Sequence, residues 1–177
     1  KNPHSGLKYA EDPALAFVEL QNEDNIFWIH PDRLNKAPFY KEMFCRQFSG
    51  WLKEKYLTHE NLVEAWGDEG MNMFSEHHNK QEHLDKENIY PIAWFPNFSP
   101  DAIKTSKSPQ RLYDNAEFLY ETQNKYYQKY TDAIRKAGYK GPVVGSCWMA
   151  GYGVSHYYNL HSDYQVGIID RHNYFAD

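Results

Sequence analysis

The stretch Leu15-Ala16-Phe17-Val18-Glu19-Leu20-Gln21-Asn22-Glu23 decides how this chain is interpreted. From Ala16 to Gln21, aliphatic side chains alternate with aromatic or polar ones, and no helix breaker interrupts them. This pattern predicts a β-strand over residues 15–21. Asp12-Pro13 favours a turn just upstream, because proline lacks the N–H that a strand ladder needs. The strand then delivers Glu23 at its carboxyl end, where parallel-barrel enzymes hold their catalytic groups. On position alone, Glu23 fits the first residue of a solvated loop better.

Two further apolar segments, residues 142–147 and 164–169, predict a second and a third strand. Helices are predicted near residues 38–56, 59–66 and 114–137, where apolar side chains recur at helical spacing. Strands that alternate with helices indicate right-handed βαβ units around a parallel sheet. We therefore predict an α/β fold.

The ends of two helices carry capping signals. Thr58 is the predicted N-cap of the short helix at 59–66, and Gly67 is its stop. Asp114 with Glu117 three residues later matches a capping box, so the last helix is predicted to begin there. Residues 67–113 have no sustained period and hold several prolines, which predicts a long irregular excursion.

Composition narrows the class of protein. The chain has 177 residues, a formal net charge of −5 and 24% charged residues without a basic block, so we expect no nucleic-acid partner. No apolar run is long enough to predict a membrane span. Aromatic residues reach 17% of the chain, and such rings serve both core packing and stacking on sugar faces. The first residue is Lys, which suggests a piece of a longer chain.

Asp-Pro-Ala-Leu-Ala-Phe-Val-Glu-Leu-Gln-Asn-Glu at residues 12–23 resembles the fourth strand of the clan A retaining glycoside hydrolases. The resemblance implies that Glu23 is the general acid/base and that Asn22 hydrogen-bonds the sugar 2-hydroxyl. His172-x-Tyr174 resembles the motif that ends strand six in that clan, where both side chains line the sugar subsite and the Tyr bonds the nucleophile. The chain would then be a single partial domain, residues 1–177, covering strands four to six of an incomplete (β/α)8 TIM barrel.

Other candidate residues follow from position alone. Trp28 lies soon after Glu23 and is either a sugar-stacking platform or a hydrophobic plug. Trp148 and Tyr152, in the loop predicted after the second strand, are candidate sugar contacts. Cys147 and His156 could form a thiol–imidazole pair, but nothing in the sequence orients them, so Cys147 is predicted to be a small buried residue.

The resemblance has a consequence for catalysis. Clan A enzymes take their nucleophile, a second Glu, from strand seven, and retaining chemistry needs two carboxyls about 5–5.5 Å apart. No such strand follows within these 177 residues, so we expect the piece alone to lack turnover and the remainder of the barrel to lie in a parent chain. We expect a poly- or oligosaccharide substrate, no metal and no cofactor. The substrate class suggests an extracellular or periplasmic location.

Two other classes of protein compete with this interpretation. A non-catalytic carbohydrate-binding or scaffold module explains the aromatic content and the missing second Glu without a longer chain. A helical interaction domain built on residues 38–66 and 114–138 would contain no parallel sheet. A downstream strand that ends in Glu would favour the enzyme over the binding module, and a parallel sheet in the structure would exclude the helical domain. The most useful single observation is the separation of Glu23 from His172 and Tyr174, because a shared cleft would support the catalytic assignment.

Overall fold

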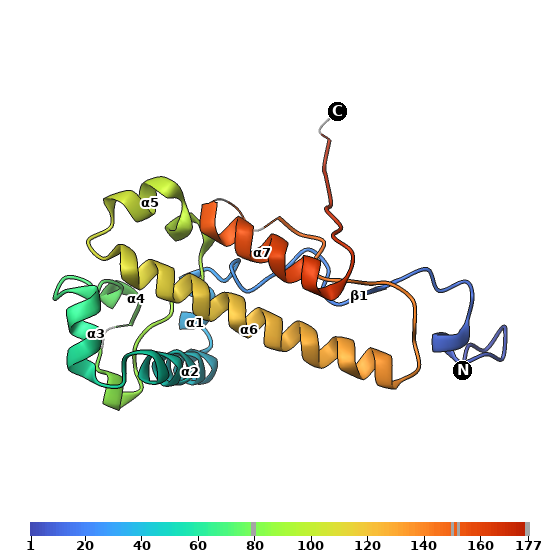
Figure 1. Ribbon diagram of the computed structural model, residues 1–177, viewed down its shortest axis with the longest axis horizontal. Helices are drawn as coiled ribbons and strands as arrows, with labels where there is room; N and C mark the ends of the chain where they lie inside the picture. The colour runs from blue at the N-terminus through green and yellow to red at the C-terminus, as the bar shows by residue number, and fades with distance from the viewer. Residues whose placement is uncertain (79–80, 150, 152, 176–177) are drawn as a thin grey trace. The chain divides into compact units, whose positions relative to one another are not determined.

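The computed structural model describes residues 1–78, 81–149, 151 and 153–175 (Figure 1). The chain divides into two compact units, and each is described by itself. Unit 1 comprises Lys1–Asn25, Tyr120–Ala150 and His156–Asp177, and unit 2 comprises Ile26–Leu119 and Gly151–Ser155. The longest helix, α6 (Pro109–Lys136), contributes its first residues to unit 2 and the rest to unit 1.

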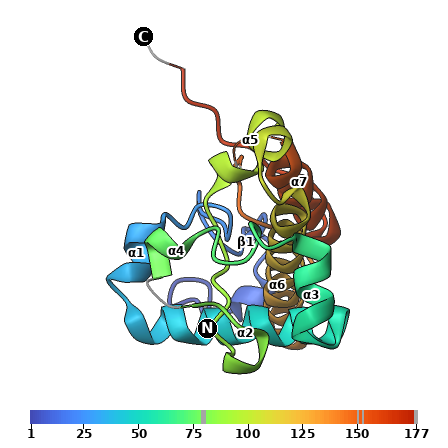
Figure 2. The same cartoon turned by 90° about the vertical axis from the view of Figure 1, so that its left-hand side faces the viewer.

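Unit 2 is built mainly from helices. In chain order they are α1 (Pro31–Asn35), α2 (Pro38–Tyr56), α3 (His59–Trp66), α4 (Ser75–His78), the 3-10 turns η2 (Leu84–Lys86) and η3 (Phe95–Phe98), and α5 (Pro100–Thr105). Figure 2 shows α2 and α3 following one another in this unit. Both predicted helices are confirmed, with proline in the first turn of α2 and the Thr58 hydroxyl capping α3. Gly67 ends α3 with φ 74°, as its lack of a Cβ allows.

Aromatic side chains fill the core of unit 2. Phe48 of α2 is fully buried and packs against Phe118 of α6 with ring centroids 4.9 Å apart. Phe27 meets Phe98 edge-on at 5.6 Å. Fully burying such a side chain contributes about 1.5–3 kcal/mol. The apolar face predicted on residues 38–56 therefore serves packing at Phe48 and Leu52, whereas Phe39 near its start is exposed.

The segment 67–113 holds α4, η2, η3, α5 and the start of α6, joined by irregular chain. Ile89, Tyr90 and Ile92 in its middle are buried. Their backbone N–H groups donate to side chains instead of a sheet: Ile89 to the Ser49 hydroxyl, Tyr90 to the Glu82 carboxylate and Ile92 to the Asn115 amide oxygen. Side-chain acceptors thus take the place of the hydrogen bonds that regular structure would supply.

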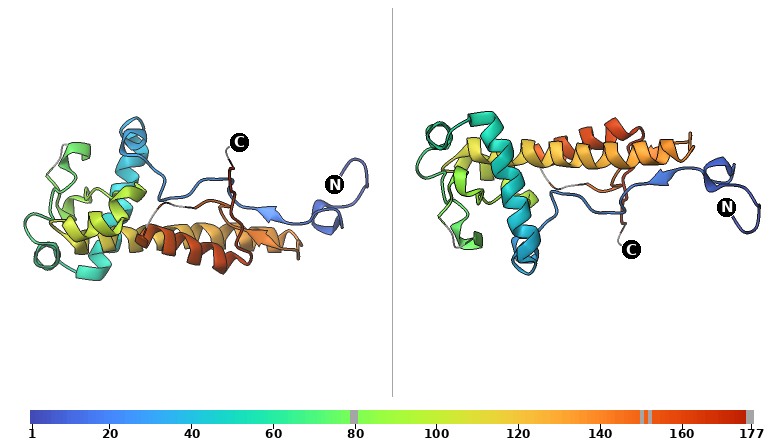
Figure 3. Two further views of the ribbon diagram at one scale, coloured as in Figure 1. Left: turned by 90° about the horizontal axis from the view of Figure 1, so that it is seen from above. Right: turned by 90° about the horizontal axis from the view of Figure 1, so that it is seen from below.

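Unit 1 contains two parallel strands, β1 (Val18–Glu19) and β2 (Val143–Val144), seen side by side in Figure 3. Val18 pairs with Val143 and Glu19 with Val144, which confirms the parallel arrangement expected for the first two segments. Backbone contact extends beyond the strands, because Leu20 N–H donates to Val144 O at 3.0 Å. The 3-10 turn η1 (Tyr9–Glu11) precedes β1.

The third predicted strand, residues 164–169, is wrong over its first half. Helix α7 (Gly153–Val166) occupies that half and much of the stretch predicted as a loop. Its residues pair at helical spacing, as when the Asn159 amide donates to the Asp163 carboxylate four residues on. Gly167, with φ 144°, ends the helix. Ile168 then forms an isolated parallel bridge to Val144, so the segment after α7 keeps the predicted direction and neighbour.

The predicted N-cap Asp114 is also wrong, because α6 begins five residues earlier at Pro109. Proline suits the first turn of a helix, since its missing N–H would be unpaired there. Asp114 lies inside the helix, fully buried, and accepts hydrogen bonds from the Trp66 indole at 2.7 Å and the Tyr56 hydroxyl at 2.6 Å. The Asp114 carboxylate therefore links α3 and the end of α2 to α6.

Within unit 1, residues 156–166 of α7 lie beside the later part of α6 (Figure 1). Tyr158 stacks on Tyr120 with centroids 4.7 Å apart, and the Tyr127 hydroxyl donates to Asp163. The described helices include none that is long and apolar enough to cross a membrane.

Candidate active site

Three extended segments of unit 1 end at the same place. Glu23, after β1, donates its backbone N–H to Ser146 O at 2.9 Å. His172, after the Ile168 bridge, donates its backbone N–H to Cys147 O at 3.0 Å. Because the segments run parallel, these bonds bring the residues that follow each segment to one edge.

Two residues at this edge have left-handed backbone. Glu23 has φ 48° and Cys147 has φ 55°. Such conformations are uncommon for residues other than glycine, and they cluster at functional sites where surrounding structure holds them. The turn at each residue ends the extended segment and redirects the side chain.

The structure brings Glu23, His172 and Tyr174 together. His172 Nδ1 lies 2.6 Å from Glu23 Oε1, and the Tyr174 hydroxyl donates to the same oxygen. Hydrogen bonds from Tyr174 and then His172 lower the pKa of the Glu23 carboxyl. The hydrogen bond to Glu23 in turn raises the pKa of His172. The resemblance implies that Tyr174 bonds a nucleophile, whereas here its hydroxyl bonds Glu23.

Other side chains able to bind a metal lie close to His172. Its Nε2 is 3.8 Å from Asp170 Oδ2, on the side opposite the Glu23 contact. Cys147 is buried as predicted, and burial together with the neighbouring Glu19 and Asp170 carboxyls raises the pKa of its thiol. The imidazole of His172 therefore contacts Glu23 through Nδ1 and faces Asp170 through Nε2.

A buried carboxylate that the sequence did not single out holds this edge in place. Asp163 of α7 accepts hydrogen bonds from Ser146 N–H at 3.2 Å and from the Arg171 guanidinium at 2.6 Å. It also accepts from the Tyr127 hydroxyl at 3.1 Å. Asp163 so ties α6, the end of β2 and the residue before His172 to one point. The sequence did not reveal this role, because Asp163 was predicted to lie between a loop and the strand at 164–169, whereas it belongs to α7.

The remaining predicted site residues lie apart from this contact. Asn22 is exposed next to Glu23 in the chain. Trp28 belongs to unit 2, where its ring stacks on Phe95 at 4.6 Å and meets Trp94 edge-on, so packing is its observed role. Trp148 follows Cys147 in unit 1, and its backbone N–H donates to the Ser146 hydroxyl. Tyr152 lies outside the described residues.

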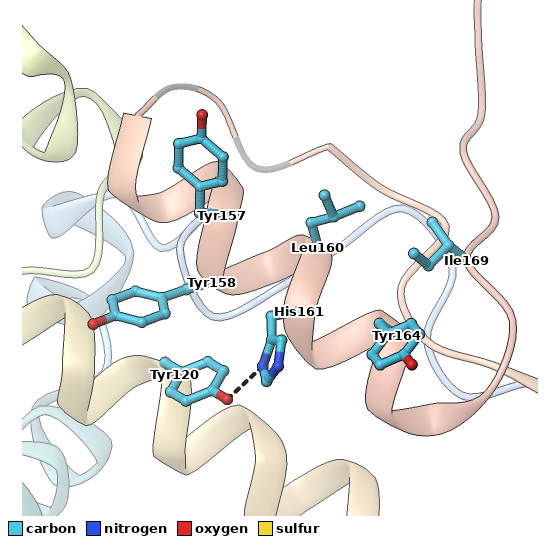
Figure 4. A pocket seen from close by; sticks show the side chains of 7 residues that line it. All are labelled: Tyr120, Tyr157, Tyr158, Leu160, His161, Tyr164 and Ile169. Carbon is cyan, nitrogen blue, oxygen red and sulfur yellow. Dashed lines mark hydrogen bonds between the residues drawn. The ribbon is translucent and has the colours of Figure 1, made fainter.

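Unit 1 also has an apolar cavity of about 620 Å³ that the sequence did not predict (Figure 4). Its lining consists of aromatic and aliphatic side chains of α6, α7 and the segment after α7: Tyr120, Tyr157, Tyr158, Leu160, His161, Tyr164 and Ile169. The Tyr120 hydroxyl and His161 Nδ1 face one another at 2.6 Å, and the Gln165 amide donates to both. None of the predicted site residues lines this cavity.

A comparison with protein families identifies the class. The family model of glycoside hydrolase family 42, described as beta-galactosidase, matches residues 6–176. The match takes in both Glu23 and the His172-x-Tyr174 segment, and it supports the clan A resemblance of the sequence. The chain therefore belongs to glycoside hydrolase family 42, and it is a glycosidase. No curated protein and no solved structure gives a significant match.

Proposed function

We propose that this chain carries the acid/base half of a retaining glycosidase active site that cleaves β-galactosides. The contact of Glu23 with both His172 and Tyr174 supports the assignment most directly, since it puts the three implied residues in one cluster. The description of the matched family supports the galactoside substrate. The two parallel strands and the Ile168 bridge are compatible with strands four to six of an incomplete barrel.

In the first step Glu23 donates a proton to the glycosidic oxygen while a second carboxylate attacks the anomeric carbon. The C–O bond breaks, the leaving alcohol carries the proton away, and a covalent glycosyl intermediate forms. In the second step Glu23 takes a proton from water, and the hydroxide oxygen displaces the carboxylate. Asn22 would bond the sugar 2-hydroxyl, and Trp148 would contact a sugar face.

The proton on Glu23 is the demanding part of this scheme. Tyr174 and His172 hold the pKa of Glu23 below its ordinary value, which suits the base but not the acid. A second ionised carboxylate about 5–5.5 Å away would oppose a charge on Glu23 and raise that pKa. The proposal assigns this carboxylate to a strand-seven Glu in a parent chain, outside these 177 residues. Its attack on the substrate would neutralise it and let Glu23 ionise again for the second step.

Hydrolysis of a nitrophenyl β-galactoside and of lactose tests the proposal. In the parent chain, Glu23→Gln should lower kcat/KM for lactose by about 10²–10⁴-fold, the range for loss of a general acid/base. Glu69→Gln, which removes an exposed carboxylate paired with Lys107, is the matched control and should leave activity unchanged.

Azide separates the acid/base from other roles. Glu23→Ala should regain turnover of the activated nitrophenyl substrate when azide is added, with a β-galactosyl azide as product, because the small anion attacks the glycosyl intermediate without base assistance. Full activity of Glu23→Gln would refute the assignment. Sugar binding without any turnover by the unsubstituted parent chain would favour a carbohydrate-binding module instead.

A further inference from the structure

Three side chains of types that bind metals lie at the same edge as Glu23, and the proposed glycosidase chemistry involves no metal. Glu19, Cys147 and His172 each offer one ligand atom, and these atoms lie within 4.8 Å of one another. We propose that they form a zinc site. The three residues are far apart in the sequence, and the parallel pairing of their segments brings them together.

The ligand types favour zinc over other common divalent ions. A thiolate sulfur, an imidazole nitrogen and a carboxylate oxygen form a borderline-soft donor set, whereas Mg²⁺ and Ca²⁺ select oxygen ligands. Zinc takes such ligands at about 2.0–2.3 Å in tetrahedral geometry. Ligand atoms around tetrahedral zinc are roughly 3.3–3.8 Å apart. Side-chain rotations that move the ligand atoms by about 1 Å would bring the three atoms to that separation.

His172 is oriented as zinc-bound histidines usually are. Its Nδ1 lies 2.6 Å from Glu23 Oε1, and metal-ligating histidines commonly donate their other ring N–H to a carboxylate. With the Nδ1 proton on the Glu23 side, the Nε2 lone pair is left for a metal. Asp170 Oδ2, 3.8 Å from that Nε2, is placed to supply a fourth ligand where water does not.

Burial at Glu19 points to the same occupant. Glu19 Oε1 is shielded from solvent, while the Glu19 side chain as a whole is partly exposed. Cys147 is 1% exposed and stands next to it. The Cys147 thiol is the hydrogen-bonding neighbour of the Glu19 carboxylate, and a cation bound between thiolate and carboxylate would balance the charge of both. The sequence predicted no metal because the ligands are too far apart in the chain to form a recognisable motif.

This site goes beyond the proposed function and does not depend on it. Zinc would join the ends of three adjacent segments through side chains, so its main effect would be on the stability of unit 1. It would also keep His172 neutral on the Nε2 side while Nδ1 still donates to Glu23. Catalysis by Glu23 could fail as a proposal while the metal site stands, and the reverse also holds.

Titration of Zn²⁺ and Co²⁺ into the chelator-treated protein tests the site. The unsubstituted protein should bind one metal, and Co²⁺ should give the near-ultraviolet thiolate-to-cobalt absorption of a cysteine ligand. Cys147→Ser should remove that absorption. It should also weaken zinc binding by more than about 100-fold, the upper end of the loss seen when a residue that only hydrogen-bonds a metal ligand is replaced. Cys45→Ser is the matched control, because Cys45 is the other buried free cysteine and lies in unit 2.

Two further variants keep the test decisive if Cys147→Ser fails to fold by circular dichroism. Glu19→Gln removes a direct ligand charge, and Glu23→Gln removes the partner of His172, which should weaken zinc binding by about 10–100-fold. Equal zinc affinity in the unsubstituted protein and Glu19→Gln, or absence of the cobalt–thiolate absorption from the unsubstituted protein, would overturn the proposal.

Discussion

His172 Nδ1 and Glu23 Oε1 lie 2.6 Å apart although 149 positions separate the two residues in the chain. The contact joins the ends of two extended segments that each bond the same stretch, Ser146 to Cys147, through the backbone. A hydrogen bond between an imidazolium and a carboxylate favours the charged form of both partners. The contact therefore favours an ionised Glu23 and a protonated His172 in the candidate active site.

The first prediction concerns pH. The pKa of His172 is raised above its ordinary 6.5, so its contribution to folding is complete below 6.5 and is lost as pH rises through the folded-state pKa. The pKa of Glu23 is lowered below 4.5, so its contribution is present above 4.5 and is lost as pH falls through the folded-state pKa. Both contributions are complete between about pH 4.5 and 6.5.

An NMR titration of the imidazole protons, with a chelator present, checks this coupling. Glu23→Gln should lower the pKa of His172 because the hydrogen bond from the carboxylate is its largest cause. Glu69→Gln serves as the control, since its carboxylate pairs with Lys107 in unit 2. An unchanged His172 titration in Glu23→Gln would contradict the contact.

The second prediction compares two glycines. A Cβ at Gly145 would overlap the buried Asp163 carboxylate and lie 3.2 Å from Tyr127 Cε2, so Gly145→Ala should lower the free energy of unfolding by about 1–3 kcal/mol. Gly50, inside α2, has open space around its Cα, and Gly50→Ala should raise stability by about 0.4–1 kcal/mol. Urea denaturation of both variants gives the signs, and a neutral Gly145→Ala would show that the Asp163 network relaxes freely.

The third prediction concerns the buried pair Arg111–Glu82 in unit 2. The Arg111 guanidinium bonds both Glu82 carboxylate oxygens, at 2.6 and 2.8 Å, and both side chains are almost wholly buried. Arg111→Met should destabilise by about 3–5 kcal/mol, because it leaves a buried carboxylate without its partner. The double variant Arg111→Met/Glu82→Leu should lose less than the single one. Chemical denaturation of the two variants checks the order, and a larger loss in the double variant would refute it.

The fourth prediction concerns Asp114. Its carboxylate accepts from Trp66 and Tyr56 and pairs with Lys55, so Asp114→Ala should lower the free energy of unfolding by about 3 kcal/mol. Asp132→Ala is the matched control on the same helix, because Asp132 is exposed on the surface of α6 and bonds Gln128 there; it should change stability by less than about 0.5 kcal/mol. Thermal melts of both variants decide between an anchoring role and a dispensable one.

Some of the structure followed from local sequence alone. The helices at 38–56 and 59–66 are confirmed, since apolar periodicity, a first-turn proline and the Thr58 cap act over a few residues. The parallel pairing of residues near 18 and 143 is confirmed as well. The third strand failed at 164–166, because a short apolar segment is also compatible with a helix, and α7 continues to Val166 there.

The sequence by itself indicated the clan A resemblance and singled out Glu23, His172 and Tyr174 as candidates, because motif and strand end lie next to one another in the chain. Only the tertiary structure decided which groups surround them. Asp163, Glu19 and Cys147 reach the site through segments far apart in sequence, and no local period encodes such contacts. The physical reason is that local patterns specify elements, whereas burial and long-range pairing specify which side chains meet.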